Sequence, residues 1–111
     1  MATNIVSPPP TLRKRALIGD SVLELVCRQY VVDNDYNLKI LTKMVSNSNL
    51  TKTGKRLGIL EHGITTRKGG TLMENYIYFL FKNMGFIETR DFVLKEIVKP
   101  IIREYGKRYK E

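Results

Sequence analysis

Two carboxylates, Asp20 and Glu74, stand where an acidic side chain needs a partner. Asp20 follows Gly19 and precedes an apolar run, and Glu74 lies near the start of the most apolar run in the chain. A carboxylate at the edge of a hydrophobic helix is costly to leave unpaired. Each carboxylate therefore needs a partner, and a metal ion is one candidate for both residues.

Helix capping is the alternative role at both places. The segments Ser21–Glu24 and Thr71–Glu74 each fit the pattern S/T-x-x-E, in which the acid bonds back to the start of a helix. Gly19 and Asp20 would then form the turn before the first of these helices. The local sequence alone favours capping over metal binding.

Other chemistries find little support in the residue types present. The chain has one histidine, His62, and one cysteine, Cys27, which excludes a structural zinc site and a disulfide framework. Cys27 lies in an apolar helical run, so we expect it to be a small core residue. No catalytic Ser/His/Asp arrangement and no phosphate-binding G-x-x-x-x-G-K-[ST] loop can be identified.

The charge balance favours an anionic partner. The 111-residue chain has a net charge of +8 and an isoelectric point of 9.7, which is typical of proteins that bind nucleic acid. An anionic membrane surface, or simply a basic soluble surface, is the alternative. No stretch is long and apolar enough to span a bilayer, and no signal-peptide core follows Met1. We therefore expect an intracellular protein, in the cytoplasm, a mitochondrion or a plastid.

The apolar spacing predicts an all-α fold in one domain. We expect this domain to span residues 12–105, between a flexible proline-rich arm at 1–11 and a basic tail at 106–111. The arm could also be a transit peptide. The glycine-containing segment 61–70 is predicted to be a loop, and Pro100 should kink or interrupt the last helix. The predicted helices span residues 21–32, 37–45, 47–57 and 71–83, with the last one beginning near Glu88.

The helix at residues 71–83 is apolar on most of its faces, which is typical of a central helix. The apolar face around Tyr76, Phe79, Leu80 and Met84 exceeds what one small core needs. A two-fold interface would bury that face, so the sequence favours a dimer.

Four segments together resemble the ribonuclease III family. Residues 16–25 read A-L-I-G-D-S-V-L-E-L and are similar to the family's signature helix, whose core is L-G-D-S-V-L-E. Residues 41–47 resemble the segment that follows it. Residues 71–77 resemble the second acidic motif, usually D-x-x-E-A-x-x-G, and Gly85-Phe86 with residues 90–93 resembles the stretch beyond. The resemblance covers most of the chain, in the family's order and spacing.

The resemblance implies an all-helical, dimeric domain that binds Mg²⁺ (or Mn²⁺) and cleaves double-stranded RNA. The family's four usual acids map onto Ala16, Asp20, Thr71 and Glu74, so two of the four acids are absent. Asp20 and Glu74 are the implied catalytic residues and metal ligands, with Glu24 and Thr71 supporting them. The A-x-x-G-D and T-x-x-E patterns resemble the short Mini-III branch, which has no double-stranded-RNA-binding domain.

Two functions are compatible with this resemblance. The first is a compact, active endoribonuclease that processes double-stranded or structured RNA. The second is a catalytically inactive, RNA-binding or structural subunit of a mitochondrial ribosome or an RNA-processing complex, which the loss of two acids would favour. A homodimer and a heterodimer with an active paralogue remain alternatives.

Basic residues in two segments are candidates for holding RNA. Lys52, Lys55 and Arg56 lie on the predicted helix at 47–57, where a solvated helix face is the simpler interpretation. Arg67 and Lys68 immediately precede the Glu74 helix and are better placed for phosphate contacts.

Overall fold

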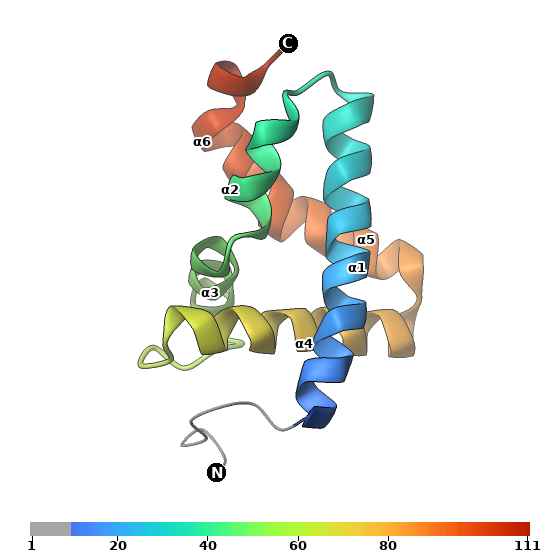
Figure 1. Ribbon diagram of the computed structural model, residues 1–111, viewed down its shortest axis with the longest axis vertical. Coiled ribbons are helices and arrows are strands. Elements are labelled where there is room, and N and C mark those ends of the chain that lie inside the picture. Colours follow the sequence, from blue (N-terminus) through green and yellow to red (C-terminus); the bar gives the residue numbers. More distant parts are fainter. Residues whose placement is uncertain (1–9) are drawn as a thin grey trace.

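The computed structural model describes residues 10–111, and these form an all-α domain (Figure 1). The fold class expected from the sequence is therefore confirmed. Two long helices, α1 (Pro10–Asp33) and α4 (Thr66–Met84), cross each other near one end of the molecule. Apart from an isolated bridge between Tyr36 and Lys110, the described part of the chain has no β-structure. None of its helices is both long and apolar enough to cross a membrane.

Shorter helices fill the space beside this crossed pair. A 3₁₀ turn, η2 (Leu38–Ile40), leads into α2 (Leu41–Val45) and α3 (Asn47–Arg56). The last part of the chain runs through α5 (Phe86–Val93), a π-helical turn η3 (Leu94–Val98) and α6 (Lys99–Tyr109). In Figure 1, α2 lies beside the upper half of α1, and α3 lies against α4; α6 packs against η2 and η3.

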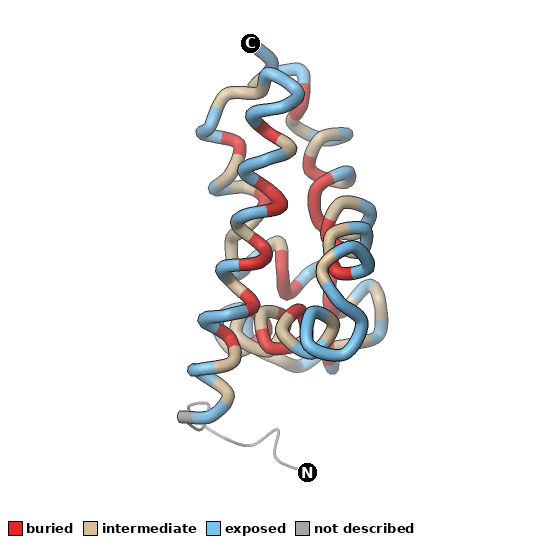
Figure 2. Tube along the Cα trace, turned by 90° about the vertical axis from the view of Figure 1, so that its right-hand side faces the viewer, coloured by how far each residue is buried: buried red, intermediate tan, exposed pale blue. Residues whose placement is uncertain are grey.

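The core follows the inward side of each helix, as the buried segments in Figure 2 show. In α1 the buried residues recur at spacings of three and four, the period of a helix that covers a core on one side. Fully buried side chains come from α1, α2, α3, α4 and the segment around η3; they include Leu23, Met44, Leu50, Met73, Ile77 and Ile97. Cys27 is among them, as predicted, and burial raises the pKa of its thiol to about 12, so it is unreactive.

Two glycines allow α3 to pack closely on α4. A Cβ atom on Gly69 would lie 2.2 Å from Oγ1 of Thr51, and one on Gly70 would lie 2.0 Å from Oδ1 of Asn47. The prediction of a loop over residues 61–70 is therefore wrong for its second half. Helix α4 begins at Thr66, with the Thr65 side chain accepting a hydrogen bond from the Lys68 amide at 3.4 Å.

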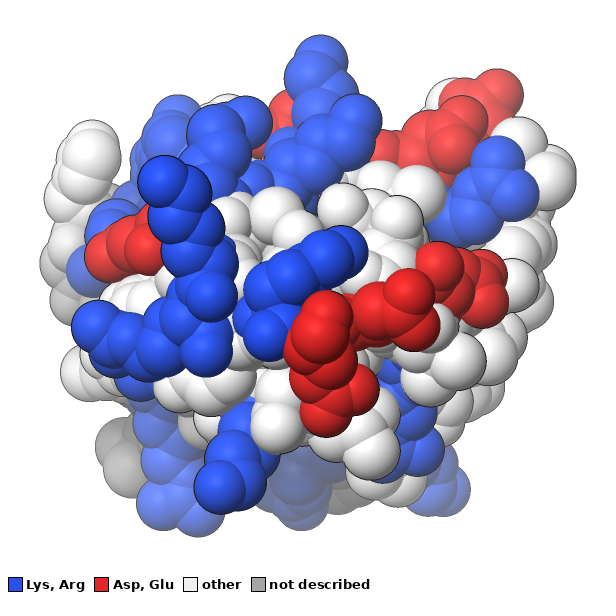
Figure 3. Space-filling model, turned by 90° about the horizontal axis from the view of Figure 1, so that it is seen from above, with Lys and Arg blue, Asp and Glu red and all other residues white. Residues whose placement is uncertain are grey.

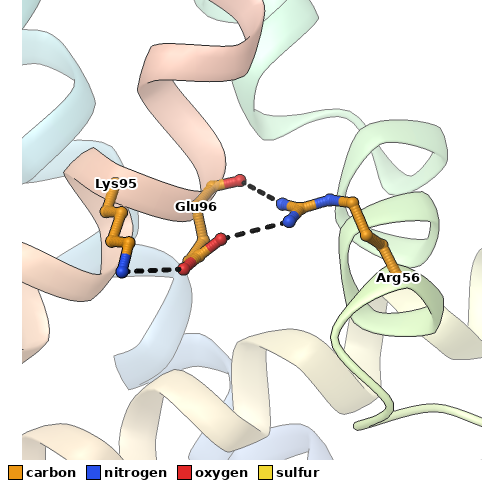
Figure 4. Close-up of polar contacts among 3 residues, drawn as sticks. All are labelled: Arg56, Lys95 and Glu96. Carbon is orange, nitrogen blue, oxygen red and sulfur yellow. Dashed lines mark hydrogen bonds and ion pairs between the residues drawn. The ribbon is translucent and has the colours of Figure 1, made fainter.

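Pro100 interrupts the last helix in the way expected, and Arg56 compensates for it. Proline has no N–H to donate to the carbonyl of Glu96, four residues earlier, and a π-helical turn occupies this place. The Arg56 guanidinium donates to that carbonyl at 3.1 Å and to Oε1 of Glu96 at 3.2 Å (Figure 4). Lys95 reaches the other carboxylate oxygen at 4.0 Å. Arg56 therefore joins α3 to the interrupted helix.

Helices extend beyond both predicted ends of the domain, into the segments assigned to the arm and the tail. Pro10 and Thr11, which were assigned to the arm, begin α1, while residues 1–9 lie outside the described part of the chain. The predicted tail at 106–111 is mostly helical, because α6 continues to Tyr109. Beyond the helix, Lys110 donates a hydrogen bond to the carbonyl of Asn34.

Candidate active site

The candidate site lies where α1 crosses α4, and Gly19 sets how closely the helices approach. A Cβ atom on Gly19 would lie 1.7 Å from the carbonyl oxygen of Glu74 and 3.2 Å from the amide nitrogen of Tyr78. Only glycine allows one helix backbone to lie against the other at this distance. The crossing places Asp20, the next residue in α1, beside Glu74 in α4.

Ala16, Asp20, Thr71 and Glu74, the four positions compared with acidic motifs in the sequence, meet in one surface pocket at this crossing. The pocket has a volume of about 230 Å³. Its lining residues are Arg13, Ala16, Leu17, Asp20, Thr71 and Glu74. Ala16 is buried, and the other three of the four positions are half-buried. The geometry therefore brings together the two carboxylates that the sequence singled out, although 53 residues separate them in the chain.

Glu74 is the more perturbed carboxyl of the pair. Its burial, its side-chain hydrogen bond with Asp20, and the negative charges of Asp20 and Glu24 together raise the pKa of Glu74 to about 8. Without a cation in the pocket, the pair therefore shares a proton at neutral pH. Perturbed carboxyl pairs of this kind gather at functional sites.

This perturbation predicts how stability depends on pH in the presence of EDTA. Glu74 keeps its proton in the folded protein up to about pH 8, but a glutamate in the unfolded chain loses it near pH 4.5. The folded state then binds more protons than the unfolded state within this window, so the free energy of unfolding should fall as pH rises through it. Urea denaturation at several pH values should show this fall, and Glu74→Gln should flatten it. Glu88→Gln, a substitution at an exposed residue, is the control and should keep the wild-type slope.

The capping roles that the local sequence favoured are wrong. Ser21 lies inside α1, and its hydroxyl donates to the carbonyl of Leu17 at 2.9 Å. Thr71 lies inside α4, one turn after the helix start, and its hydroxyl donates to the carbonyl of Arg67 at 3.4 Å. Asp20 and Glu74 therefore do not serve a helix end, and capping gives no reason for their presence in this pocket.

The two supporting residues lie close to the pair. Glu24 is one turn beyond Asp20 in α1; it forms an ion pair with Arg28 at 2.9 Å and still contributes to the raised pKa of Glu74. Thr71 lines the pocket itself, and its hydroxyl oxygen keeps lone pairs available.

Divalent metal chemistry fits this donor set. Asp20 and Glu74 offer carboxylate oxygens at hydrogen-bond distance from each other, and a cation between them would relieve the repulsion that otherwise holds a proton there. Among residues 10–111 no group of three or more His, Cys, Asp or Glu side chains could hold a metal. Mg²⁺ suits such a sparse site, because it commonly keeps several waters and binds through one or two carboxylates.

Arg13 and Arg67 add positive charge beside the carboxylates. Arg13 lines the pocket and precedes Ala16 and Asp20 by three and seven residues, which places all three on one face of α1. Arg67 is exposed and precedes Thr71 and Glu74 by four and seven residues, which places it on the same face of α4. Arg13 is not among the residues predicted from the sequence, because the helix predicted to begin at residue 21 does not include it.

The other basic candidates lie away from the pocket. Lys68 is half-buried at the first turn of α4 and is not among the residues that line the pocket. Lys52 is exposed on α3 and lines a separate groove of about 320 Å³, whereas Lys55 is half-buried. The Arg56 guanidinium donates hydrogen bonds to Glu96. This structural role explains the residue without an RNA contact.

The apolar face expected to form a dimer interface is only partly available. Tyr76 packs against Phe92 with ring centroids 5.6 Å apart, and Leu80 is half-buried. Phe79 and Met84 remain 43% and 55% exposed, and Arg15 lies over the Phe79 ring. Leu17, beside the acidic pair in α1, is 68% exposed and extends the apolar surface next to the pocket.

A comparison with known proteins gives a match along most of the chain. Ribonuclease 3 of Flavobacterium psychrophilum is 25% identical over 108 aligned residues, which cover 85% of this chain. This chain is similar to a ribonuclease. The aligned region makes up 44% of that ribonuclease 3, so the chain spans less than half the length of its relative. No family profile and no solved structure matches the chain.

Proposed function

We propose that this chain is a Mg²⁺-dependent endoribonuclease that cleaves double-stranded or structured RNA. The observation that carries the proposal is the pocket between two crossing helices that brings the side chains of Asp20 and Glu74 within hydrogen-bond distance of each other. Its positions correspond to the four acid positions of the family that the sequence resembles, and the similarity to ribonuclease 3 supports the same chemistry.

In this proposal, Asp20 and Glu74 hold the metal through their carboxylates. When bound, Mg²⁺ would supply a water activated for attack and would neutralise charge on the phosphate undergoing cleavage. Glu74 must lose its proton to become a ligand, so metal binding and proton release are coupled. Ala16 and Thr71 leave room for water in place of carboxylates, as in the compact Mini-III branch.

Positive side chains beside the pocket would orient the RNA. Arg67, on the same face of α4 as Glu74, would contact a phosphate near the cleaved bond. We also propose a homodimer, in which the exposed apolar residues Leu17, Phe79 and Met84 are covered and two pockets act on one duplex.

A non-catalytic, RNA-binding subunit is the second candidate function, with an active paralogue or a ribosomal assembly as its partner. Ala16 and Thr71 favour it, because they leave the pocket with two carboxylates and the described residues offer no third ligand. The pocket would then be an inherited feature, and RNA would bind without being cut.

The experiment that separates these functions is an incubation with labelled duplex RNA. The proposal predicts cleavage by the wild-type protein in Mg²⁺ and none in EDTA. If a folded, dimeric wild-type protein binds the duplex but does not cut it in Mg²⁺ or Mn²⁺, the enzyme proposal is wrong and the second function is favoured.

A further inference from the structure

Helix α6 carries a row of cations that has no role in the pocket. Lys99, Arg103 and Lys107 recur every fourth residue and are all exposed. With a rise of 1.5 Å per residue, their backbone positions lie about 6 Å apart along one face. No hydrogen bond or ion pair holds any of the three within the described part of the chain. We call these three residues the α6 ridge.

The ridge is electrostatically unfavourable for an isolated helix. Like charges four residues apart destabilise a helix, and this row contains two such pairs in succession. The one acid within α6, Glu104, lines the groove that contains Lys43 and Lys52 and lies three residues before Lys107, but no ion pair joins it to Lys107. Among the described residues, no acid is therefore ion-paired with the ridge. Figure 3 shows lysine and arginine side chains gathered on the side of this end of the molecule where α6 lies.

The ridge is also held in a fixed place. On the inward side of α6, Ile101 and Gly106 are buried. At its end, the Asn37 amide donates to the carbonyl of Tyr109 at 2.7 Å, and the Glu111 amide donates to the carbonyl of Asp35 at 2.8 Å. A cation row on an anchored helix loses little backbone freedom on binding.

We propose that the α6 ridge binds the phosphate backbone of duplex RNA, as a second contact beyond the carboxylate pocket. An evenly spaced row of cations suits a polyanion whose charges also repeat at short intervals. A membrane surface fits less well, because the apolar side of α6 is packed against the core and cannot enter a bilayer. The inference rests on the proposed function for the identity of the nucleic acid.

The position of the ridge predicts a preference for long duplexes. Asp20 lies 13 residues before the end of α1, a distance of about 20 Å along the helix. The end of α6 is tied to the turn just beyond α1, through Asp35 and Asn37. RNA that fills the pocket must therefore extend well past the cleaved bond before it reaches Lys107.

The test is RNA binding measured by fluorescence anisotropy in EDTA, where no cleavage occurs. The ridge variant carries Lys99→Gln, Arg103→Gln and Lys107→Gln. The control variant carries Lys39→Gln, Lys82→Gln and Arg108→Gln, which removes the same charge from exposed residues outside the ridge. Arg108 is also on α6 but is rotated by about 100° from Lys107. The probes are a duplex of about 16 base pairs, the span of a typical double-stranded-RNA-binding domain, and one half as long.

The ridge variant should bind the longer duplex roughly tenfold more weakly than wild type, with a salt slope lower by about 2. It should bind the short duplex almost as well as wild type does. The control variant should bind both duplexes with an affinity similar to that of wild type. If the ridge and control variants lose RNA affinity equally, only total charge matters. If the ridge variant keeps wild-type RNA affinity, α6 does not contact RNA. Loss of binding to phosphatidylserine vesicles with RNA binding intact would identify a lipid surface instead. All three results would overturn the proposal.

Cleavage is scored separately, so the two proposals fail independently. A protein that binds RNA through the ridge but never cuts it would contradict the enzyme proposal and leave the ridge in place. If the ridge variant cuts RNA and binds it with wild-type affinity, the ridge proposal is wrong and the enzyme proposal stands.

Discussion

Gly19→Ala should strongly destabilise the folded protein relative to the wild type. In an ordinary helix this change stabilises by about 1 kcal/mol. Here the new Cβ would lie 1.7 Å from the carbonyl oxygen and 2.7 Å from the carbonyl carbon of Glu74. Neither atom belongs to a flexible side chain, so α1 and α4 must separate. We expect a loss of about 3 kcal/mol or more, a large share of the 5–15 kcal/mol typical of a whole domain.

Urea denaturation followed by circular dichroism measures this loss, and Gly63→Ala is the matched control. A Cβ on Gly63 would have no neighbour within 4 Å, and its backbone is not left-handed. The control should therefore stay within about 0.5 kcal/mol of wild type. Equal stability of the Gly19 and Gly63 variants would contradict the close helix crossing on which the site depends.

Asp20→Asn and Glu74→Gln should each reduce cleavage of duplex RNA at least about 100-fold in kcat/KM, which corresponds to ~2.7 kcal/mol of transition-state stabilisation. Each amide keeps the shape of the side chain but cannot supply the negative charge that would hold the proposed cation. If the two carboxylates share one cation, as proposed, the double variant should be little worse than either single variant. Glu88→Gln changes an exposed acid on α5 and should keep full activity.

RNA affinity in EDTA distinguishes this chemical effect from damage to the fold. Asp20→Asn removes negative charge from the pocket, whereas Glu74→Gln replaces a carboxyl that holds its proton below about pH 8, so RNA binding should be slightly tighter in the first variant and unchanged in the second. If both cleavage and affinity fell together, with a lower free energy of unfolding, the carboxylates would be structural residues.

The helices could largely be predicted from the sequence, because their apolar spacing carries the information. The helix expected at 47–57 is α3, which ends at Arg56. Gly58 follows it with a left-handed φ of 75°, and Gly85 ends α4 with a φ of 87°. These positions need glycine for a local reason, so the local sequence indicates them.

The errors arose where tertiary contacts override local preference. Gly69 and Gly70 suggest a loop because glycine disfavours helix, yet α4 requires them for the approach of Thr51 and Asn47. Ser21 and Thr71 match a capping pattern, but each lies within a helix that starts earlier. The pattern cannot show whether the preceding residues are already helical.

The site was accessible from the sequence only in part. Asp20 and Glu74 were identified by their apolar surroundings and by the resemblance, but spacing alone does not bring residues this far apart in the chain together. The crossing at Gly19 does so, and it also explains why burial and mutual repulsion raise the pKa of Glu74. Arg13 can be assigned to the pocket only when it is known that α1 begins at Pro10 and therefore includes Arg13.

The most direct test of the carboxylate pocket is Mn²⁺ binding to the full chain, followed by electron paramagnetic resonance at a pH above the Glu74 pKa of about 8. The proposed site predicts saturable binding by wild type, weaker binding below this pH, and loss of binding in both Asp20→Asn and Glu74→Gln. Unchanged Mn²⁺ binding by these folded variants, or no binding by wild type, would contradict a metal site between α1 and α4.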